Sequence, residues 1–337
     1  MAELICATCL STISPVGLTP ESAAAAMRAG INAFAELPYV ESSGEPIVGA
    51  VVADIPPSVG GRARVVELLV RAVESACASL PAHLSESDLP VILCTREPER
   101  RGPKLSGIMV EVEARLQVTF SRQGSAHLAS GHVAALEALD RARRLVGEGR
   151  GACLIAAVDT LIDARTLEWL DGTGRLKTSK QSDGVIPGEA ASVVLVTAKP
   201  VTPSCVRVRG LGFSRETATV LNDEPLLATG MTAAARDALG EASISMDEVD
   251  FRLTDVAGES YAFEEMVLAQ SRVMRRTRES QPLWHPAGSV GDVGAAAGLM
   301  QIAWAEQAFV RSYSPGPVAM AHASAAAGAR AVAVLTR

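Results

Sequence analysis

The stretch SAHLASGHVAALEAL, residues 125–139, sets a turn of small residues directly before an apolar helix. The turn is the tripeptide ASG at 129–131, and the apolar face of the predicted helix holds Val133, Leu136 and Leu139. A helix N-terminus behind such a turn often holds a catalytic nucleophile, because backbone N–H groups there stabilise negative charge. The residue just before the turn is Leu128, which has no nucleophilic atom. The sequence thus predicts a nucleophile's position that leucine occupies.

The same order of elements occurs twice along the chain. In the first copy, GHVAALEA (131–138) opens a helix, which is followed by the strands GACLIAAVD (151–159) and GEAASVVLVT (188–197). In the second, DVGAAAGL (292–299) opens a helix before the strands GPVAMAHAS (316–324) and GARAVAVLT (328–336). Such self-similarity indicates an internal duplication. Strands that alternate with helices predict an α/β fold.

The two copies differ mainly by a long excursion at residues 160–187 in the first copy, where the second has a short alanine-rich turn. Prolines at 200 and 203 mark the join between the copies. We therefore expect an N-terminal half at 1–200, with an insertion at 160–187, and a C-terminal half at 201–337. A functional site between the halves would follow from this arrangement.

Composition narrows the function classes. The chain has 337 residues, 48% of them hydrophobic, and a net charge of −7. Without an extended basic surface, a nucleic-acid partner is not expected. No apolar run reaches the roughly 18 residues that span a membrane, and no secretory signal opens the sequence, so we expect a cytoplasmic protein outside the membrane. The six cysteines show no disulfide-like framework. Cys6 and Cys9 have the C-x-x-C spacing, but no second pair and no histidine is near them in sequence, so neither a metal nor a cofactor is expected.

Further blocks carry a family resemblance. LICATCLSTISPVGLTPESAAAAMRAG (4–30), QSDGVIPGEAASVVLV (181–196), GSVGDVGAAAGLM (288–300) and HASAAAGARAVAVL (322–335) follow one another in order with the turn of 129–131. Together they resemble the thiolase superfamily and, within it, the β-ketoacyl synthases. The resemblance implies a thiolase-like fold, in which two duplicated βαβ halves form α-β-α-β-α layers. It extends over the length of the chain, which is shorter than an elongating synthase.

The catalytic residues of that family are replaced one by one. The family's cysteine falls on Leu128, its first histidine on Ala257, its second histidine on Asp292 and its lysine on Ala287. Ketosynthase chemistry needs a thiolate to accept the acyl group and neutral hydrogen-bond donors to polarise a thioester. Leucine and alanine supply neither, and an aspartate would repel a developing enolate. The resemblance therefore predicts a catalytically inactive member.

A different enzyme in the same cleft is an alternative. It would be an acyltransferase or thioesterase that acts on acyl-CoA or acyl carrier protein without a cysteine nucleophile, with serine activated by histidine and an acidic residue. The candidate residues are Ser125, Ser130, His127, His132, His285, Asp255 and Asp292. Glu189 and Asp183, in the segment DGVIPGEAA, are expected to have structural or capping roles rather than acid–base roles.

An inactive member would act through binding. The resemblance implies a homodimer, or a heterodimer with an active ketosynthase, formed through the predicted strand Leu116 to Phe120. It also suggests an acyl carrier protein as a partner, or a protein of a type VI secretion effector cluster. We therefore expect a binding, scaffold or dimer-partner subunit. It would be accessory either to acyl-chain biosynthesis or to a type VI secretion effector cluster.

Overall fold

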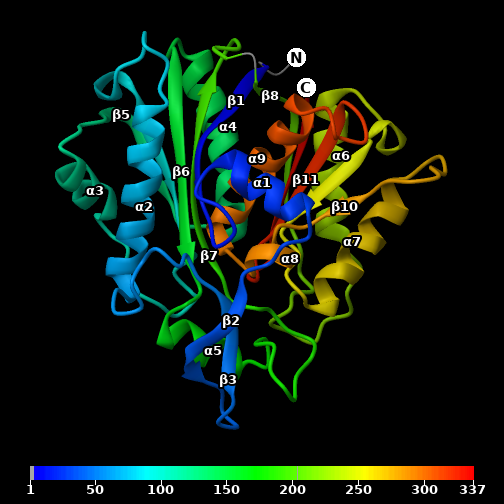
Figure 1. Cartoon of the computed structure of the whole chain (residues 1–337). Coiled ribbons are helices and arrows are strands. Elements are labelled where there is room, and N and C mark those ends of the chain that lie inside the picture. Colours follow the sequence, from blue (N-terminus) through cyan, green and yellow to red (C-terminus); the bar gives the residue numbers. More distant parts are fainter. Residues whose placement is uncertain (1–3, 203) are drawn as a thin grey trace.

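A computed structural model describes residues 4–202 and 204–337. Ten strands form one sheet in the order β10-β9-β11-β12-β8-β1-β7-β6-β4-β5 (Figure 1). The strands of the first half are β1 (Ile5–Ile13), β4 (Pro90–Cys94), β5 (Ser121–Leu128), β6 (Ala152–Thr160) and β7 (Glu189–Thr197). Those of the second are β8 (Val206–Arg215), β9 (Phe251–Thr254), β10 (Leu283–Trp284), β11 (Val318–Ser324) and β12 (Ala329–Thr336).

The strand order shows the duplication directly. From the centre outward, the first half runs β1, β7, β6, β4, β5 and the second runs β8, β12, β11, β9, β10. In both halves this is the first strand, then the fifth, fourth, second and third of that half. The halves meet where β1 pairs antiparallel with β8, with Ile5 opposite Val208. The predicted boundary at residue 200 lies in the loop between β7 and β8, and the division into domains stays a prediction.

Helices form three layers around the two halves of the sheet (Figure 1). The middle layer is α1 (Pro20–Arg28), α4 (Ala134–Gly147) and α9 (Ala297–Val310). Outside the first half lie α2 (Gly61–Ala78) and α3 (Ile108–Leu116), and outside the second lie α6 (Thr229–Ala242) and α7 (Ser260–Val273). Every residue of α9 from Ala297 to Phe309 is buried, as expected for a helix between two sheet faces.

Separate hydrophobic clusters fill the spaces between these layers. The largest joins α4 and α9 to strands of both halves, the second packs α2 on the first half, and the third packs α6 and α7 on the second half. The α/β fold with duplicated halves and α-β-α-β-α layers, predicted from the sequence, is confirmed.

The predicted excursion at 160–187 contains α5 (Ala164–Gly172). It shares a small hydrophobic cluster with the hairpin of β2 (Phe34–Val40) and β3 (Pro46–Ala50). Figure 1 shows this group at one end of the molecule, beyond the ends of β6 and β7. Helix α8 (Ala287–Val290) and the short turns η2 (Gly131–Val133) and η4 (Gly294–Ala296) lead into the site described below.

The prediction of a strand from Leu116 to Phe120 is wrong. Leu116 is the last residue of α3, and Gln117 ends that helix in the left-handed conformation, with φ of 56°. The amide of Phe120 donates to Oε1 of Glu113 at 3.0 Å, and the ring of Phe120 is buried in the second hydrophobic cluster. The edge strand is β5, which starts one residue later, at Ser121. Helix capping and burial of Phe120 thus override the strand preference of Val118 and its neighbours.

Among the described helices, none has both the length and the apolar character that crossing a membrane requires.

Candidate functional site

Leu128 ends β5 directly before the turn of residues 129–131. Its carbonyl accepts from the amide of Thr95 at 3.0 Å, and the amide of Gly131 donates to the carbonyl of Thr95 at 3.1 Å. Gly131 has φ of 61°, which favours glycine. The Leu128 side chain is partly buried and packs against the central hydrophobic cluster. The turn thus has the geometry that its sequence predicts, and an aliphatic side chain lies at its start.

His132 and Asp292 form an ion pair across the two halves. His132 lies in η2 and donates from Nε2 to Oδ1 of Asp292 at 2.8 Å; Asp292 also accepts from the amide of Gly294 at 2.8 Å. Burial disfavours the imidazolium, but the charge and hydrogen bond of Asp292 outweigh it and raise the pKa of His132 to about 10. For Asp292, burial is likewise outweighed by His132, and its pKa falls to about 2. Both groups are therefore charged at neutral pH.

Two further carboxyl side chains lie beneath the equivalent turns of the two halves. A side chain at Gly131, which opens η2, would collide with the carboxylate of Glu97; one at Gly294, which opens η4, would collide with that of Asp159. Asp159 accepts from the amide of Ala295 at 2.9 Å and forms a buried ion pair with Arg100. The two duplicated turns thus share one feature: the glycine that opens each turn leaves space for a carboxylate.

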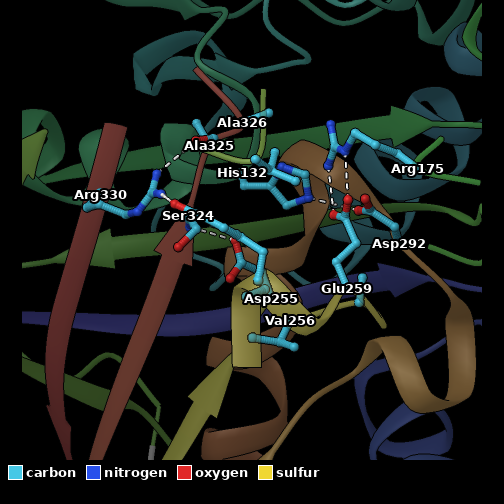
Figure 2. Close-up of a pocket in the computed structure, with 14 residues that line it drawn as sticks. His132, Arg175, Asp255, Val256, Glu259, Asp292, Ser324, Ala325, Ala326 and Arg330 are labelled. Atoms are coloured by element: carbon cyan, nitrogen blue, oxygen red, sulfur yellow. Dashed lines mark hydrogen bonds and ion pairs between the residues drawn. The ribbon is translucent and has the colours of Figure 1, made fainter. Parts of the chain in front are cut away.

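A small cavity opens beside the His132–Asp292 pair (Figure 2). Its volume is about 50 Å³, against roughly 300–1,000 Å³ for typical small-molecule sites. Its lining is His132, Arg175, Val220, Asp255, Val256, Ala257, Glu259, Tyr261, Ala262, Asp292, Ser324, Ala325, Ala326 and Arg330. Room for a few water molecules is left, which is too little for an acyl chain.

Ion pairs fix the walls of this cavity. Arg175 donates through Nε and Nη2 to the two carboxylate oxygens of Glu259 at 2.7 and 2.8 Å. Arg330 donates through Nε to Glu265 at 2.7 Å, and both side chains of that pair are 1% exposed. Removing one member of a buried pair leaves an uncompensated charge, so such pairs strongly resist rearrangement.

Asp255 lies beside Ser324 in the lining of the cavity (Figure 2). Its Oδ2 accepts from the amide of Ser324 at 2.7 Å, and burial raises the pKa of its carboxyl to about 6. Of the four positions predicted to be degenerate, Asp292 and Ala257 line this cavity. Leu128 and Ala287, the latter at the start of α8, lie outside its lining.

Neither candidate serine forms a hydrogen bond with the His132–Asp292 pair in the described part of the chain. Oγ of Ser125 donates to the carbonyl of Ser121 at 2.6 Å and accepts from the amide of Val91 at 2.8 Å. Ser130 directly precedes η2 and makes no capping hydrogen bond there. Neither serine lines the cavity.

Two of the candidate histidines contact residues outside the His132–Asp292 pair. Nε2 of His127 lies 2.8 Å from Oγ1 of Thr95, and the ring of His285 meets that of Phe263 edge-on at 6.2 Å between centroids. Burial lowers the pKa of both histidines. Of the residues proposed for another enzyme, the structure thus brings together His132, Asp292 and Asp255.

Glu189 and Asp183 have structural contacts. Glu189, at the start of β7, is fully buried and forms an ion pair with Arg64 at 2.6 Å. Oδ1 of Asp183 accepts from the amide of Ser260, the first residue of α7, at 2.6 Å. Contacts of this kind are those of a buried pair and a helix cap.

Sequence reasoning missed most of the charged residues around the cavity. Arg175 lies in the excursion, and Glu97 and Arg100 lie in the loop after β4. A signal existed for Arg330, which interrupts the otherwise apolar strand ARAVAVLT, because arginine is rarely buried without a partner. No local pattern marked the others, since their partners are distant in sequence.

No protein-family model and no curated protein matches the chain. Several solved structures do match it. The AntDE:AntF complex, a type II PKS acyl-carrier protein with its ketosynthase bound to the hexaketide, matches with a TM-score of 0.82 at 14% identity over 100% of both chains. The ishigamide ketosynthase/chain length factor matches with 0.75 at 16% identity over 100% of this chain and 99% of that one.

The ketosynthase ApeO in complex with its chain length factor ApeC from Xenorhabdus doucetiae is also similar. Its TM-score is 0.74 at 14% identity, over 99% of this chain and 98% of that chain. At such identities the likeness concerns the fold. The chain thus has the thiolase-like fold of ketosynthases and chain length factors, as its sequence motifs predicted.

Proposed function

We propose that this protein is a catalytically inactive ketosynthase-like subunit that acts by binding a partner chain. The observation that carries the proposal is the filled site. Leu128 stands where the resemblance places the nucleophile, and Asp292, held by His132, stands where it places a histidine. An aspartate already committed to an ion pair neither donates to a thioester carbonyl nor stabilises an enolate.

The space around these positions supports the same proposal. The cavity of about 50 Å³ is bounded by buried or half-buried ion pairs, so admitting an acyl chain would require separating charges inside the protein. So small a cavity supports a protein whose side chains fill the cleft instead of leaving room for a substrate.

The partner surface proposed is the free edge of β5. This eight-residue strand ends the sheet and pairs on one side with β4. An unpaired edge of this length invites pairing with a strand of another chain. Beside it lies a groove of about 320 Å³ between β5 and α3, whose lining includes Phe120, Arg122, Ala126 and His127. A partner would cover both features at once.

The similar structures favour a partner of the same fold. They include a ketosynthase with its chain length factor and a ketosynthase with an acyl-carrier protein. We therefore propose a homodimer or a heterodimer with an active ketosynthase, with an acyl carrier protein as a further partner. A role beside a type VI secretion effector remains a second setting for the same binding activity.

The enzyme alternative has one observation in its favour, the His132–Asp292 pair. In a hydrolase triad the histidine also contacts the nucleophile. Here the hydroxyl of Ser125 is committed to the backbone of Ser121 and Val91. The proposed acyltransferase or thioesterase is therefore the weaker of the two functions.

The oligomeric state tests the proposal. We expect light scattering after size exclusion to give a dimer at micromolar concentration, or a stable complex when the chain is co-expressed with a ketosynthase. Ala126→Arg, on the half-buried groove beside β5, should abolish that assembly. The matched control is Ala233→Arg, on the exposed face of α6, which should leave it intact.

Two results would overturn the proposal. One is a chain that stays monomeric alone and binds no co-expressed ketosynthase. The other is an assembly that withstands Ala126→Arg while the variant keeps its circular dichroism spectrum, because the interface would then lie elsewhere.

A further inference from the structure

A second cavity, of about 250 Å³, lies between the β2–β3 hairpin and the N-terminus of α2. It shares no lining residue with the His132–Asp292 site or the groove beside β5. Its walls include the aliphatic side chains of Leu37, Val51, Ile55, Val59 and Ile162. Aliphatic walls of this kind offer a favourable surface to an apolar ligand.

One buried arginine fixes the wall that the loop between β3 and α2 provides. Arg64 is 4% exposed and forms a two-bond ion pair with Glu189, at 2.6 Å for each bond. Its remaining N–H groups donate to backbone carbonyls of the loop, those of Val52, Ile55, Pro56 and Val59, at 3.2–3.3 Å. Glu189 in turn accepts from the amide of Val52 at 2.8 Å. These hydrogen bonds from Arg64 and to Glu189 therefore fix the backbone conformation of the loop.

This clamp has a consequence for binding. A preformed cavity spares a ligand the cost of ordering its walls, and that cost is a large part of what weakens association. Aliphatic walls offer water few hydrogen-bond partners. An apolar group that enters therefore displaces only weakly bound water.

Gly60, the N-cap of α2, both lines the cavity and is exposed, and we therefore take it as part of the cavity's mouth. A Cβ added at Gly60 would meet no heavy atom within 4 Å, so the space above it is open. Its backbone is extended, with φ of −124°, and other residues adopt this conformation without strain. Gly60 is therefore a position at which a larger side chain blocks the entrance without disturbing the helix.

We propose that this cavity binds an aliphatic chain on the order of ten carbon atoms. An engineered apolar cavity of about 150 Å³ holds benzene, with six carbons, and 250 Å³ scales to about ten. Five lining residues have branched aliphatic side chains, Tyr39 is the one aromatic ring among them, and the charged members of the lining are Glu36 and Arg64. This composition favours an aliphatic over a stacked aromatic ligand. The site is independent of the proposed partner role.

Binding of n-alkanols to the full chain tests the proposal, because their head group is neutral and constant. In titrations followed by calorimetry from butanol to dodecanol, we expect affinity to rise about fourfold per methylene and to level off near ten carbons. A continued rise with length, or no saturable binding, would contradict it. Comparing the affinities of decanoic acid and decanoyl-pantetheine then distinguishes two sources of the chain. Tighter binding of decanoic acid indicates a free fatty acid, and tighter binding of decanoyl-pantetheine indicates a chain carried as a thioester.

Two substitutions locate the binding. Gly60→Leu at the mouth should weaken decanol binding at least tenfold, whereas Gly151→Leu should not change it; an added Cβ meets nothing within 4 Å at either glycine. Ala53→Phe, at the exposed rim, is the second blocking variant should Gly60→Leu lose its fold. Wild-type affinity in a folded blocking variant would overturn the proposal.

Discussion

His132 and Asp292 show how one contact between distant residues sets the character of the cleft. They are separated by 160 positions in the sequence, and each lies at a turn that opens a helix of the middle layer. At the position of Asp292 the sequence resemblance places a histidine, whereas this chain has a carboxylate paired with His132. Because the pair is buried, the charges depend on each other, and a change in one residue is expected to alter the titration of the other.

Asp292→Asn tests this dependence. The raised pKa of His132 contributes stability that is fully present below its unfolded value of about 6.5 and is lost as pH rises through about 10. We expect wild-type His132 to remain protonated at pH 8 in histidine NMR spectra. In the variant, His132 keeps only the attraction of Asp255 and Glu97 against its burial, so its pKa should fall well below the wild-type value. The free energy of unfolding at pH 7 should fall by about 3–5 kcal/mol.

The control is Asp237→Asn on the exposed face of α6, which should change stability by less than about 0.5 kcal/mol. A wild-type His132 that titrates near pH 6.5 would show that the ion pair does not form.

Glu306 gives a second residue-scale prediction. It is 2% exposed in α9, its carboxylate accepts from the amide of Cys9 at 2.6 Å, and burial raises its pKa to about 8. Stability from this group is fully present below the unfolded pKa of about 4.5 and is lost as pH rises through 8.

Glu306→Gln should remove that loss while keeping an acceptor for Cys9. Urea unfolding should give similar stabilities near pH 5, and at pH 8.5 the variant should be the more stable by roughly 1.4 kcal/mol for each unit of the pKa shift it abolishes, up to several kcal/mol. Parallel pH profiles for the two proteins would contradict the prediction.

At this scale, motifs and spacing could place individual residues but not their partners. The ASG turn singled out Leu128, and the GDVGAAAG segment singled out Asp292, because both stand at fixed distances from glycines that the backbone needs. Glu97 and Arg100 follow an ordinary strand, and nothing near them in sequence indicates that they lie under the two turns. Pairing across the duplicated halves is a property of the tertiary fold.

At the scale of elements, the Arg64–Glu189 pair ties α2, β7 and the loop after β3 together. Arg64→Met should leave the Glu189 carboxylate buried without a cation and lower the free energy of unfolding by about 3–5 kcal/mol. It should also make residues 52–59 more sensitive to limited proteolysis, since their carbonyls lose the shared donor.

Arg71→Met on the same helix is the matched control. Arg71 pairs with Glu67 at 2.9 Å, but both side chains are about 30% exposed, so the loss should stay below about 1 kcal/mol. Equal costs for the two arginines would show that the clamp contributes no more than a surface pair.

Element boundaries show where local sequence signals mislead. The segment LQVTF at 116–120 has the composition of a strand, yet its first residue ends α3 and its last is buried beneath that helix. The adjoining SRQGSAHL is polar and contains glycine, yet it forms β5, because the parallel register with β4 is set by the sheet rather than by local preference.

At the scale of the whole molecule, the duplication was the most predictable feature. The helices α4 and α9, which start at 134 and 297 behind equivalent turns, lead into strands in the same order, and both repeats occupy equivalent places in the sheet. Predicting what fills the space between them was harder, because Arg175 and Glu259 come from the excursion and from the loop before α7. The duplicated framework and the cavity between its halves thus have different sequence signatures.

The most direct test of an inactive, partner-binding role is intact-protein mass spectrometry after incubation with acyl-CoA and acyl carrier protein thioesters, with a parallel assay of thiol release. An active ketosynthase serves as the positive control, and peptide mapping separates any adduct at the cleft from chance acylation of a cysteine. We predict no adduct at the cleft and thiol release at background. An adduct on Ser130 or a neighbour of His132, or thiol release that Asp292→Asn abolishes in the folded protein, would contradict the account.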